Sequence, residues 1–246
     1  LSDVFLGAIH SWFESMSGFT TTGATVIDAS TSPLCTAIGD CIGSQPKSLI
    51  LWRSVTQWLG GMGVIMLGLL ILSQALGGGM TLAKAELTGP SLSRLGPSLQ
   101  WTAKRLWSIY IALTIIQLIL LITIGKMNTF DSVNYSLTTL SSGGFGTSDT
   151  GIMSFDSATI EYIIMIFMLL TCINFSLFHL VLAGRSREAF KDEELRGYLL
   201  IIFVAWIAMA YNLHSSDFNN GSFLDTLRDT AFQAISISST GYSSTN

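Results

Sequence analysis

The chain has 246 residues, of which 49% are hydrophobic and only 11% charged, and its formal net charge is −4. Soluble globular domains carry about 25% charged residues, so this composition excludes an ordinary soluble domain and predicts an integral membrane protein. No cluster of basic residues suggests a nucleic-acid partner.

The first predicted element is a short, weakly polar half-helix at 13–22 that leads into the turn Thr-Thr-Thr-Gly-Ala-Thr at 20–25. Before it, residues 1–5 lack a start Met and a basic flank, so we expect the tail of an earlier helix and a chain that is a fragment. The loop that follows contains Cys35 and Cys41. Their spacing fits a disulfide in an oxidising compartment and fits two free thiols equally well.

Four later segments are long enough to cross a bilayer, which takes about 20 apolar residues. They cover 49–76, 106–125, 162–184 and 197–213, the last being the shortest. Glycines at 60, 61, 63 and 68 in the first segment predict close backbone approach to a neighbouring helix.

Two further glycine turns lie among these spans. They read Ser-Gly-Gly-Phe-Gly-Thr at 142–147 and Ser-Thr-Gly-Tyr-Ser-Ser at 239–244. Each follows a segment too short and too polar to span, for which we predict helix starts at Asp131 and at Ser222, the latter with Asp225 in a Ser-x-x-Asp pattern. Such segments are often re-entrant, and irregular backbone at membrane depth requires a cavity or protein around it.

The distribution of basic residues predicts the orientation. The connections after the first and third spans hold most of them: Lys84, Arg94, Lys104, Arg105, Arg185, Arg187, Lys191 and Arg196. By the positive-inside rule these connections are cytoplasmic, which places all three glycine turns outside. Eight aspartates are expected on the same side, where negative charge attracts cations: Asp28, Asp40, Asp131, Asp149, Asp156, Asp217, Asp225 and Asp229.

The repeated unit is therefore span, half-helix, glycine turn, span, an all-α polytopic fold of the kind found in potassium channels. We expect residues 1–100 to hold the end of a first repeat, 101–194 a complete second repeat and 195–246 the start of a third. Backbone carbonyls around a glycine can replace the water shell of a potassium ion, because glycine permits the required backbone angles. Half-helix carboxyl ends add partial negative charge.

The turns at 19–25, 140–147 and 237–242, together with Leu-Trp-Arg and Gln-Trp-Leu-Gly-Gly-Met-Gly within 51–63, resemble Trk-type potassium-uptake proteins, the TrkH branch of the Trk/Ktr/HKT superfamily. The resemblance implies a four-repeat pore in the bacterial inner membrane, with its filter facing the periplasm. It implies K+ as the transported ion, a homodimer, a cytoplasmic TrkA-type nucleotide-binding ring and no organic cofactor in this chain. The fourth filter is absent from the sequence. The implied filter residues are Thr21, Thr22, Gly23, Ala24, Ser142, Gly143, Gly144, Phe145, Ser239, Thr240, Gly241 and Tyr242.

Other classes of protein fit less well. A cation-coupled secondary transporter with broken helices is the alternative, although three turns in one orientation differ from the inverted repeats common in that class. An intramembrane enzyme needs paired ionisable groups inside the membrane, and the spans hold almost none. Arg53 either tunes the charge near the turns or pairs with an acid, for which Glu14 is the candidate.

Overall fold

The computed structural model describes residues 7–35, 39–76, 99–182, 184–215 and 223–244. Within these ranges every regular element is a helix, which confirms the predicted all-α class. Among the described residues, two segments are long and apolar enough to cross a membrane, Lys104–Thr123 and Glu193–Leu213.

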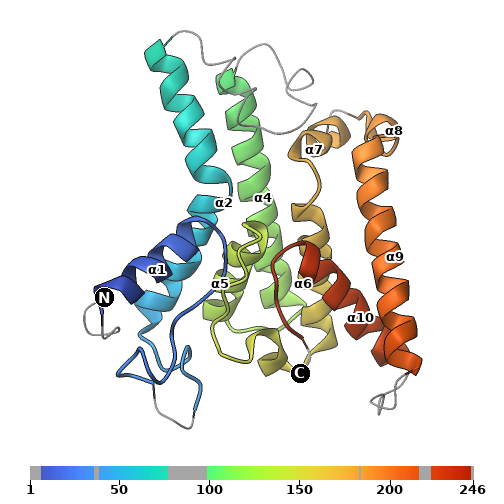
Figure 1. Ribbon diagram of the computed structural model, residues 1–246. Coiled ribbons are helices and arrows are strands. Elements are labelled where there is room, and N and C mark those ends of the chain that lie inside the picture. The colour runs from blue at the N-terminus through green and yellow to red at the C-terminus, as the bar shows by residue number, and fades with distance from the viewer. Residues whose placement is uncertain (1–6, 36–38, 77–98, 183, 216–222, 245–246) are drawn as a thin grey trace.

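Three long helices run along the long direction of the molecule (Figure 1). They are α2 (Lys47–Leu76), α4 (Leu99–Thr123) and α9 (Glu193–Ser215), and they correspond to three of the four predicted spans.

The fourth predicted span, 162–184, is not one continuous helix. It is divided into α6 (Ala158–Thr171) and α7 (Phe175–Leu182). At the break the Thr171 hydroxyl bonds back to the carbonyl of Met168 at 2.8 Å, and the Cys172 thiol donates to the carbonyl of Ser238 at 3.4 Å. Side chains that compete for backbone groups weaken a helix locally, and here they also tie the break to the end of another helix.

Three short helices lie among the long ones, in the lower half of Figure 1. They are α1 (Ala8–Phe19), α5 (Thr129–Leu140) and α10 (Phe223–Ser238), and each leads into a glycine turn. The prediction that Asp131 caps α5 is wrong, because Asn128 is the cap and its side chain accepts from the Asp131 N–H at 2.9 Å. The predicted start at Ser222 lies outside the described residues.

The remaining elements are short and lie in connections, namely η2 (Gly151–Phe155) and α8 (Ser186–Ala189).

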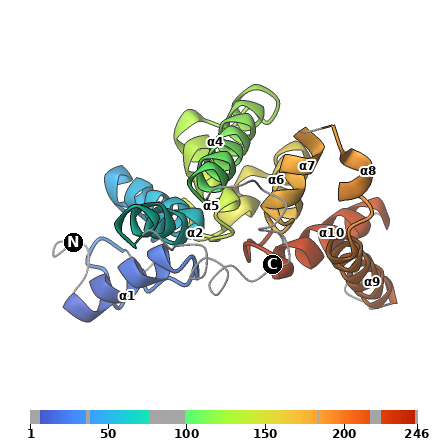
Figure 2. The ribbon, with the colours of Figure 1, turned by 90° about the horizontal axis from the view of Figure 1, so that it is seen from above.

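In the view from above, α1 and α2 lie at one side of the molecule, α4 to α7 in the middle and α8 and α9 at the other side, with α10 between α6 and α9 (Figure 2). Helix α1 packs on α2, and α10 packs on α9. In addition, α2 packs on α5, and α6 packs on α10. The helix that follows one glycine turn therefore supports the short helix that precedes the next turn.

The distribution of apolar and polar side chains between surface and interior fits a membrane protein. Helix α9 exposes large apolar side chains, among them Leu200 (62% exposed) and Ile201 (70%). Helix α5, by contrast, buries its polar side chains, which include Ser132, Asn134, Ser136, Thr138 and Thr139. Apolar groups outside and polar groups inside are the pattern expected when lipid, not water, surrounds the long helices.

Candidate functional site at the three glycine turns

The glycine at the centre of each turn has a left-handed backbone. The φ angles are +76° at Gly23, +84° at Gly144 and +77° at Gly241. Residues other than glycine rarely adopt the left-handed region of backbone angles. The three glycines predicted from the sequence as equivalent thus share one backbone conformation.

The structure brings the three turns together in a fixed order. A Cβ atom added to Gly23 would overlap the carbonyl oxygen of Gly143, and one added to Gly144 would overlap the carbonyl oxygen of Thr240. Each of these glycines therefore packs against the residue that precedes the glycine of the following turn. A Cβ atom on Gly241 would meet no described atom within 4 Å, so the third turn has an open side.

A cavity of about 200 Å³ lies where the turns meet. Gly23, Gly144 and Gly241 all line it, together with Arg53 and Asp149. Five of the twelve predicted site residues line this cavity, namely Gly23, Gly144, Phe145, Gly241 and Tyr242, and they come from segments that are far apart in the chain.

The helix ends are held by similar backbone bonds. The N–H of Thr22 donates to Ser17 at 3.0 Å, that of Gly143 to Thr138 at 2.9 Å, and that of Gly241 to Ser236 at 2.9 Å, each to the carbonyl. In the third turn the donor is the glycine itself, so one residue fewer separates helix from glycine. The carboxyl ends of α1, α5 and α10, which carry partial negative charge, thus adjoin the turns.

Hydroxyl groups of the short helices brace the backbone beyond the glycines. Ser17 donates to the carbonyl of Ala24 at 2.5 Å, and Ser236 donates to the carbonyl of Tyr242 at 2.6 Å. The corresponding hydroxyl in α5, that of Thr138, bonds instead to the hydroxyl of Tyr242. The third turn is in this way tied to the second half-helix.

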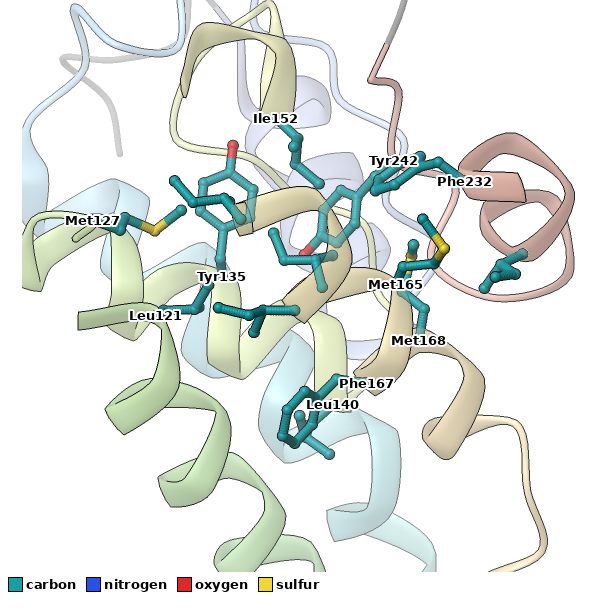
Figure 3. Packing of buried hydrophobic residues seen from close by; sticks show 14 of the residues in the cluster. Leu121, Met127, Tyr135, Leu140, Ile152, Met165, Phe167, Met168, Phe232 and Tyr242 are labelled. Atoms are coloured by element: carbon teal, nitrogen blue, oxygen red, sulfur yellow. The ribbon is translucent and has the colours of Figure 1, made fainter. Parts of the chain in front are cut away.

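Two of the predicted site residues have large side chains, and both side chains are buried. Phe145 is 2% exposed and Tyr242 is 4% exposed. Tyr242 packs against Tyr135, with 5.6 Å between ring centroids, at the centre of the buried cluster in Figure 3. Both residues also line the cavity, although their side chains are almost entirely buried.

The smaller predicted residues also make mostly structural contacts. The hydroxyls of Ser142 and Ser239 lie 3.0 Å apart and join the second turn to the third. The Thr22 hydroxyl lies 2.8 Å from that of Thr20, within the first turn. Thr21 and Ser142 both have φ of +54°, a strained conformation for residues other than glycine.

A buried ion pair lies beside the turns. Arg53 Nε is 2.6 Å from Glu14 Oε1, which bears out the pairing of Arg53 with an acid. The Arg53 guanidinium also lies 4.0 Å from the centre of the Phe145 ring. Glu14 in turn accepts from the Thr25 hydroxyl at 2.9 Å and from the Val26 N–H at 3.1 Å. The ion pair thus connects Thr25 and Val26, at the end of the first turn, to Phe145 in the second turn.

The connections after the first and second turns hold each other through two aspartates. Asp149 accepts from the N–H groups of Cys41 at 2.7 Å and Ile42 at 2.8 Å. Asp40 accepts from the N–H of Asp149 at 2.8 Å. Cys41 is joined to Cys35 in a disulfide, which decides between the two alternatives that the sequence left open.

Several of the expected acidic residues are thus engaged within the protein. Arg228 lies within 3.6 Å of both Asp225 and Asp229. Hydrogen bonds from the Ser30 hydroxyl and N–H lower the pKa of the exposed Asp28 carboxyl. Asp217 lies outside the described residues.

One residue near the turns was missed by the sequence reasoning. Gln57 in α2 is fully buried, and its side chain bonds to the backbone on both sides of Gly144. A polar side chain in the middle of an apolar span is the signal that would have singled it out.

These features define a class of protein, a helical membrane protein in which half-helices and glycine turns surround a common cavity. The TrkH family model, described as a cation transport protein, matches residues 2–246. The TrkH potassium uptake protein of the Trk system of Escherichia coli K12 is 36% identical over 237 residues, covering 94% of this chain and 45% of that protein. That of Halomonas elongata is 39% identical over 235 residues, covering 93% of this chain and 45% of that protein.

A solved structure agrees with these relatives. The crystal structure of the potassium transporter TrkH from Vibrio parahaemolyticus matches with a TM-score of 0.74 and 31% identity, over 97% of this chain and 46% of that one. The chain thus belongs to the TrkH family of cation transport proteins. It spans about 45% of the length of the curated relatives it matches.

Proposed function

We propose that this chain supplies three strands of the selectivity filter in a potassium transporter. The observation that carries the proposal is the ordered meeting of Gly23, Gly144 and Gly241 around one cavity. The implied ligands are backbone carbonyls, because most of the neighbouring side chains are engaged in bracing. A ring of carbonyls suits a dehydrated K+ ion.

A fourth strand would complete such a ring. Gly23 and Gly144 are each covered by a carbonyl of the next turn, whereas nothing described covers Gly241. We propose that a carbonyl from a fourth repeat of the full-length protein fills that side. On this basis residues 1–100, 101–194 and 195–246 are the end of a first repeat, a complete second repeat and the start of a third.

The wider setting of the proposed transporter follows from the family. We propose a homodimer in the bacterial inner membrane, with its filter loops facing the periplasm and a TrkA-type nucleotide-binding ring on the cytoplasmic side. K+ is the transported cargo.

Uptake of rubidium-86 into liposomes that hold the full-length protein tests this function. The expected result is uptake driven by the rubidium gradient alone, competed by potassium and barely by sodium. Uptake that requires a proton or sodium gradient would instead support the alternative, a coupled secondary transporter with broken helices. An absence of uptake under every gradient would contradict both.

A glycine substitution tests the proposed site itself. Gly144→Ser should lower the preference for potassium over sodium, because φ is +84° and an added Cβ would overlap the carbonyl oxygen of Thr240. Gly184→Ser is the matched control, since Gly184 has φ of +77° but no described atom within 4 Å of an added Cβ. An unchanged ion preference in Gly144→Ser would remove Gly144 from the filter.

A further inference from the structure

Gln57 holds the backbone on both sides of Gly144. Its Nε2 donates to the carbonyl of Gly143 at 2.7 Å, and its Oε1 accepts from the N–H of Phe145 at 3.2 Å. The side chain amide thus pairs with the main chain much as a neighbouring strand would. Since Gln57 is fully buried, no water competes for these bonds.

The sequence of the second turn is matched to this contact. A Cβ atom on Gly143 would overlap the amide of Gln57. The first and third turns have Thr22 and Thr240 at the corresponding place, where a side chain is accommodated. The double glycine of the second turn therefore has a structural reason, which is that the Gln57 amide occupies the space of a side chain.

The residue before the glycine of the third turn is contacted by a different kind of group. Met168 in α6 is fully buried, and its sulfur lies 2.8 Å from the hydroxyl of Thr240. Helices α2 and α6 each follow one turn and support the next, so Gln57 and Met168 hold equivalent places. Only Gln57 of these two bonds the backbone, and a thioether is a weak acceptor with no proton to donate.

We infer that Gln57 is a positioning residue that sets the ion selectivity of the second filter strand. By fixing the peptide groups on both sides of Gly144, it fixes the direction of the carbonyls that would face an ion. Its amide also engages one lone pair of the Gly143 oxygen, which makes that ligand unlike those of the other strands. This inference rests on the proposed function.

The test compares full-length variants in liposomes by rubidium-86 uptake under competition from sodium and potassium. Gln57→Met installs the group found at the equivalent place in the next repeat, with similar volume and without either hydrogen bond. We expect sodium to compete about tenfold better relative to potassium than in the wild type, as the loss of roughly one to two buried hydrogen bonds predicts. Gln57→Asn keeps the amide but is one methylene too short to reach both backbone atoms, and should show a smaller loss in the same direction.

Gln117→Met is the matched control. Gln117 in α4 is also fully buried, and neither its Oε1 nor its Nε2 has a hydrogen-bond partner among the described residues. We expect its substitution to leave the ion preference unchanged. Thermal unfolding of each variant in detergent separates a loss of fold from a loss of selectivity, and Gln57→Asn carries the test if Gln57→Met does not fold.

The inference is overturned if both Gln57 variants keep the wild-type ion preference, or if Gln117→Met shifts it equally. The wild type serves as the check on the proposed function itself. Uptake by the wild type that shows no preference for potassium would contradict the filter proposal rather than the role of Gln57.

Discussion

Glu14 and Arg53 form an ion pair that water hardly reaches, with side chains that are 3% and 2% exposed. Burying two charges costs solvation free energy, and only good geometry and further hydrogen bonds compensate for it. Glu14 receives such bonds from Thr25 and Val26, while the Arg53 guanidinium lies over the Phe145 ring. The pair therefore links two turns, and losing one partner leaves the other charge buried and unpaired.

Glu14→Gln should lower the free energy of unfolding by about 3–5 kcal/mol, as expected when one partner of a buried pair is removed. The double variant Glu14→Gln, Arg53→Gln should be less destabilised than the sum of the single variants, because no isolated charge remains. Thermal unfolding of the full-length protein in detergent measures both.

The exposed pair of Arg185 and Glu188 is the control for this prediction. Their side chains are 59% and 53% exposed, with 2.6 Å between Arg185 Nη2 and Glu188 Oε2. Exposed ion pairs contribute little to stability, so Arg185→Gln should leave the melting temperature unchanged. Equal shifts in Arg185→Gln and Glu14→Gln would contradict the role assigned to burial.

At the scale of elements, α2 approaches the ends of two short helices through its glycines. A Cβ on Gly60 would overlap the carbonyl oxygen of Phe19 at the end of α1, and one on Gly61 would lie 2.8 Å from the Cβ of Ser141 after α5. Gly63 makes only ordinary contact, at 3.7 Å, with Trp107. The side-chain surroundings of Gly68 lie outside the described residues.

Gly60→Ala should therefore lower the free energy of unfolding by about 1–3 kcal/mol, the usual effect of overpacking a close contact. Gly63→Ala is the matched control in the same helix. It should be neutral or stabilising by up to about 1 kcal/mol, because alanine loses less backbone entropy in a helix than glycine does. Equal stability of the two variants would show that α2 does not lie this close to Phe19.

The loop connections are held by hydrogen bonds rather than by packing. The Asp149 carboxylate accepts hydrogen bonds from the N–H groups of Cys41 and Ile42, one on each oxygen. An asparagine at this position could accept through only one oxygen. Asp149→Asn should speed amide hydrogen exchange at Cys41 and Ile42 by about tenfold, since bonds to charged groups are the stronger ones.

Asp156→Asn, in the same connection, tests whether any loss of charge has this effect. Asp156 has φ of +41°, a region that asparagine tolerates. We expect exchange at Cys41 and Ile42 to stay at the wild-type rate in this variant. An equal increase in both variants would assign the effect to charge in general.

The sequence alone predicted the helical class, the short helices and the equivalence of the three central glycines. Hydropathy and glycine turns are local signals, so they can be read without knowing the fold. It did not predict the division of 162–184 into two helices, because the bonds that hold the break come from Ser238 and Ser239 far along the chain. Asn128 was missed as the cap of α5 because Asp131, three residues later, is an equally good capping residue. Gln57 was missed because its partners lie 86 and 88 residues away.

At the scale of the whole molecule, the turns and their connections gather at one end, and α7 and α8 lie toward the other (Figure 1). The basic residues Arg185, Arg187 and Lys191 lie at this second end, in the connection from α7 to α9. Positively charged connections remain on the cytoplasmic side during insertion. The fold and the charge distribution together therefore predict that the proposed filter opens toward the periplasm.

Cysteine labelling of the full-length protein in spheroplasts tests this orientation. Ala29→Cys places a thiol in the exposed connection after the first turn, and Arg187→Cys places one in the exposed connection after α7. Both are made together with Cys172→Ser, so that the free cysteine of the described residues does not react. A membrane-impermeant maleimide should label Ala29→Cys in intact spheroplasts and label Arg187→Cys only after lysis. The reverse pattern would place the glycine turns on the cytoplasmic side, because a charged reagent reaches only the face of the bilayer to which it is added.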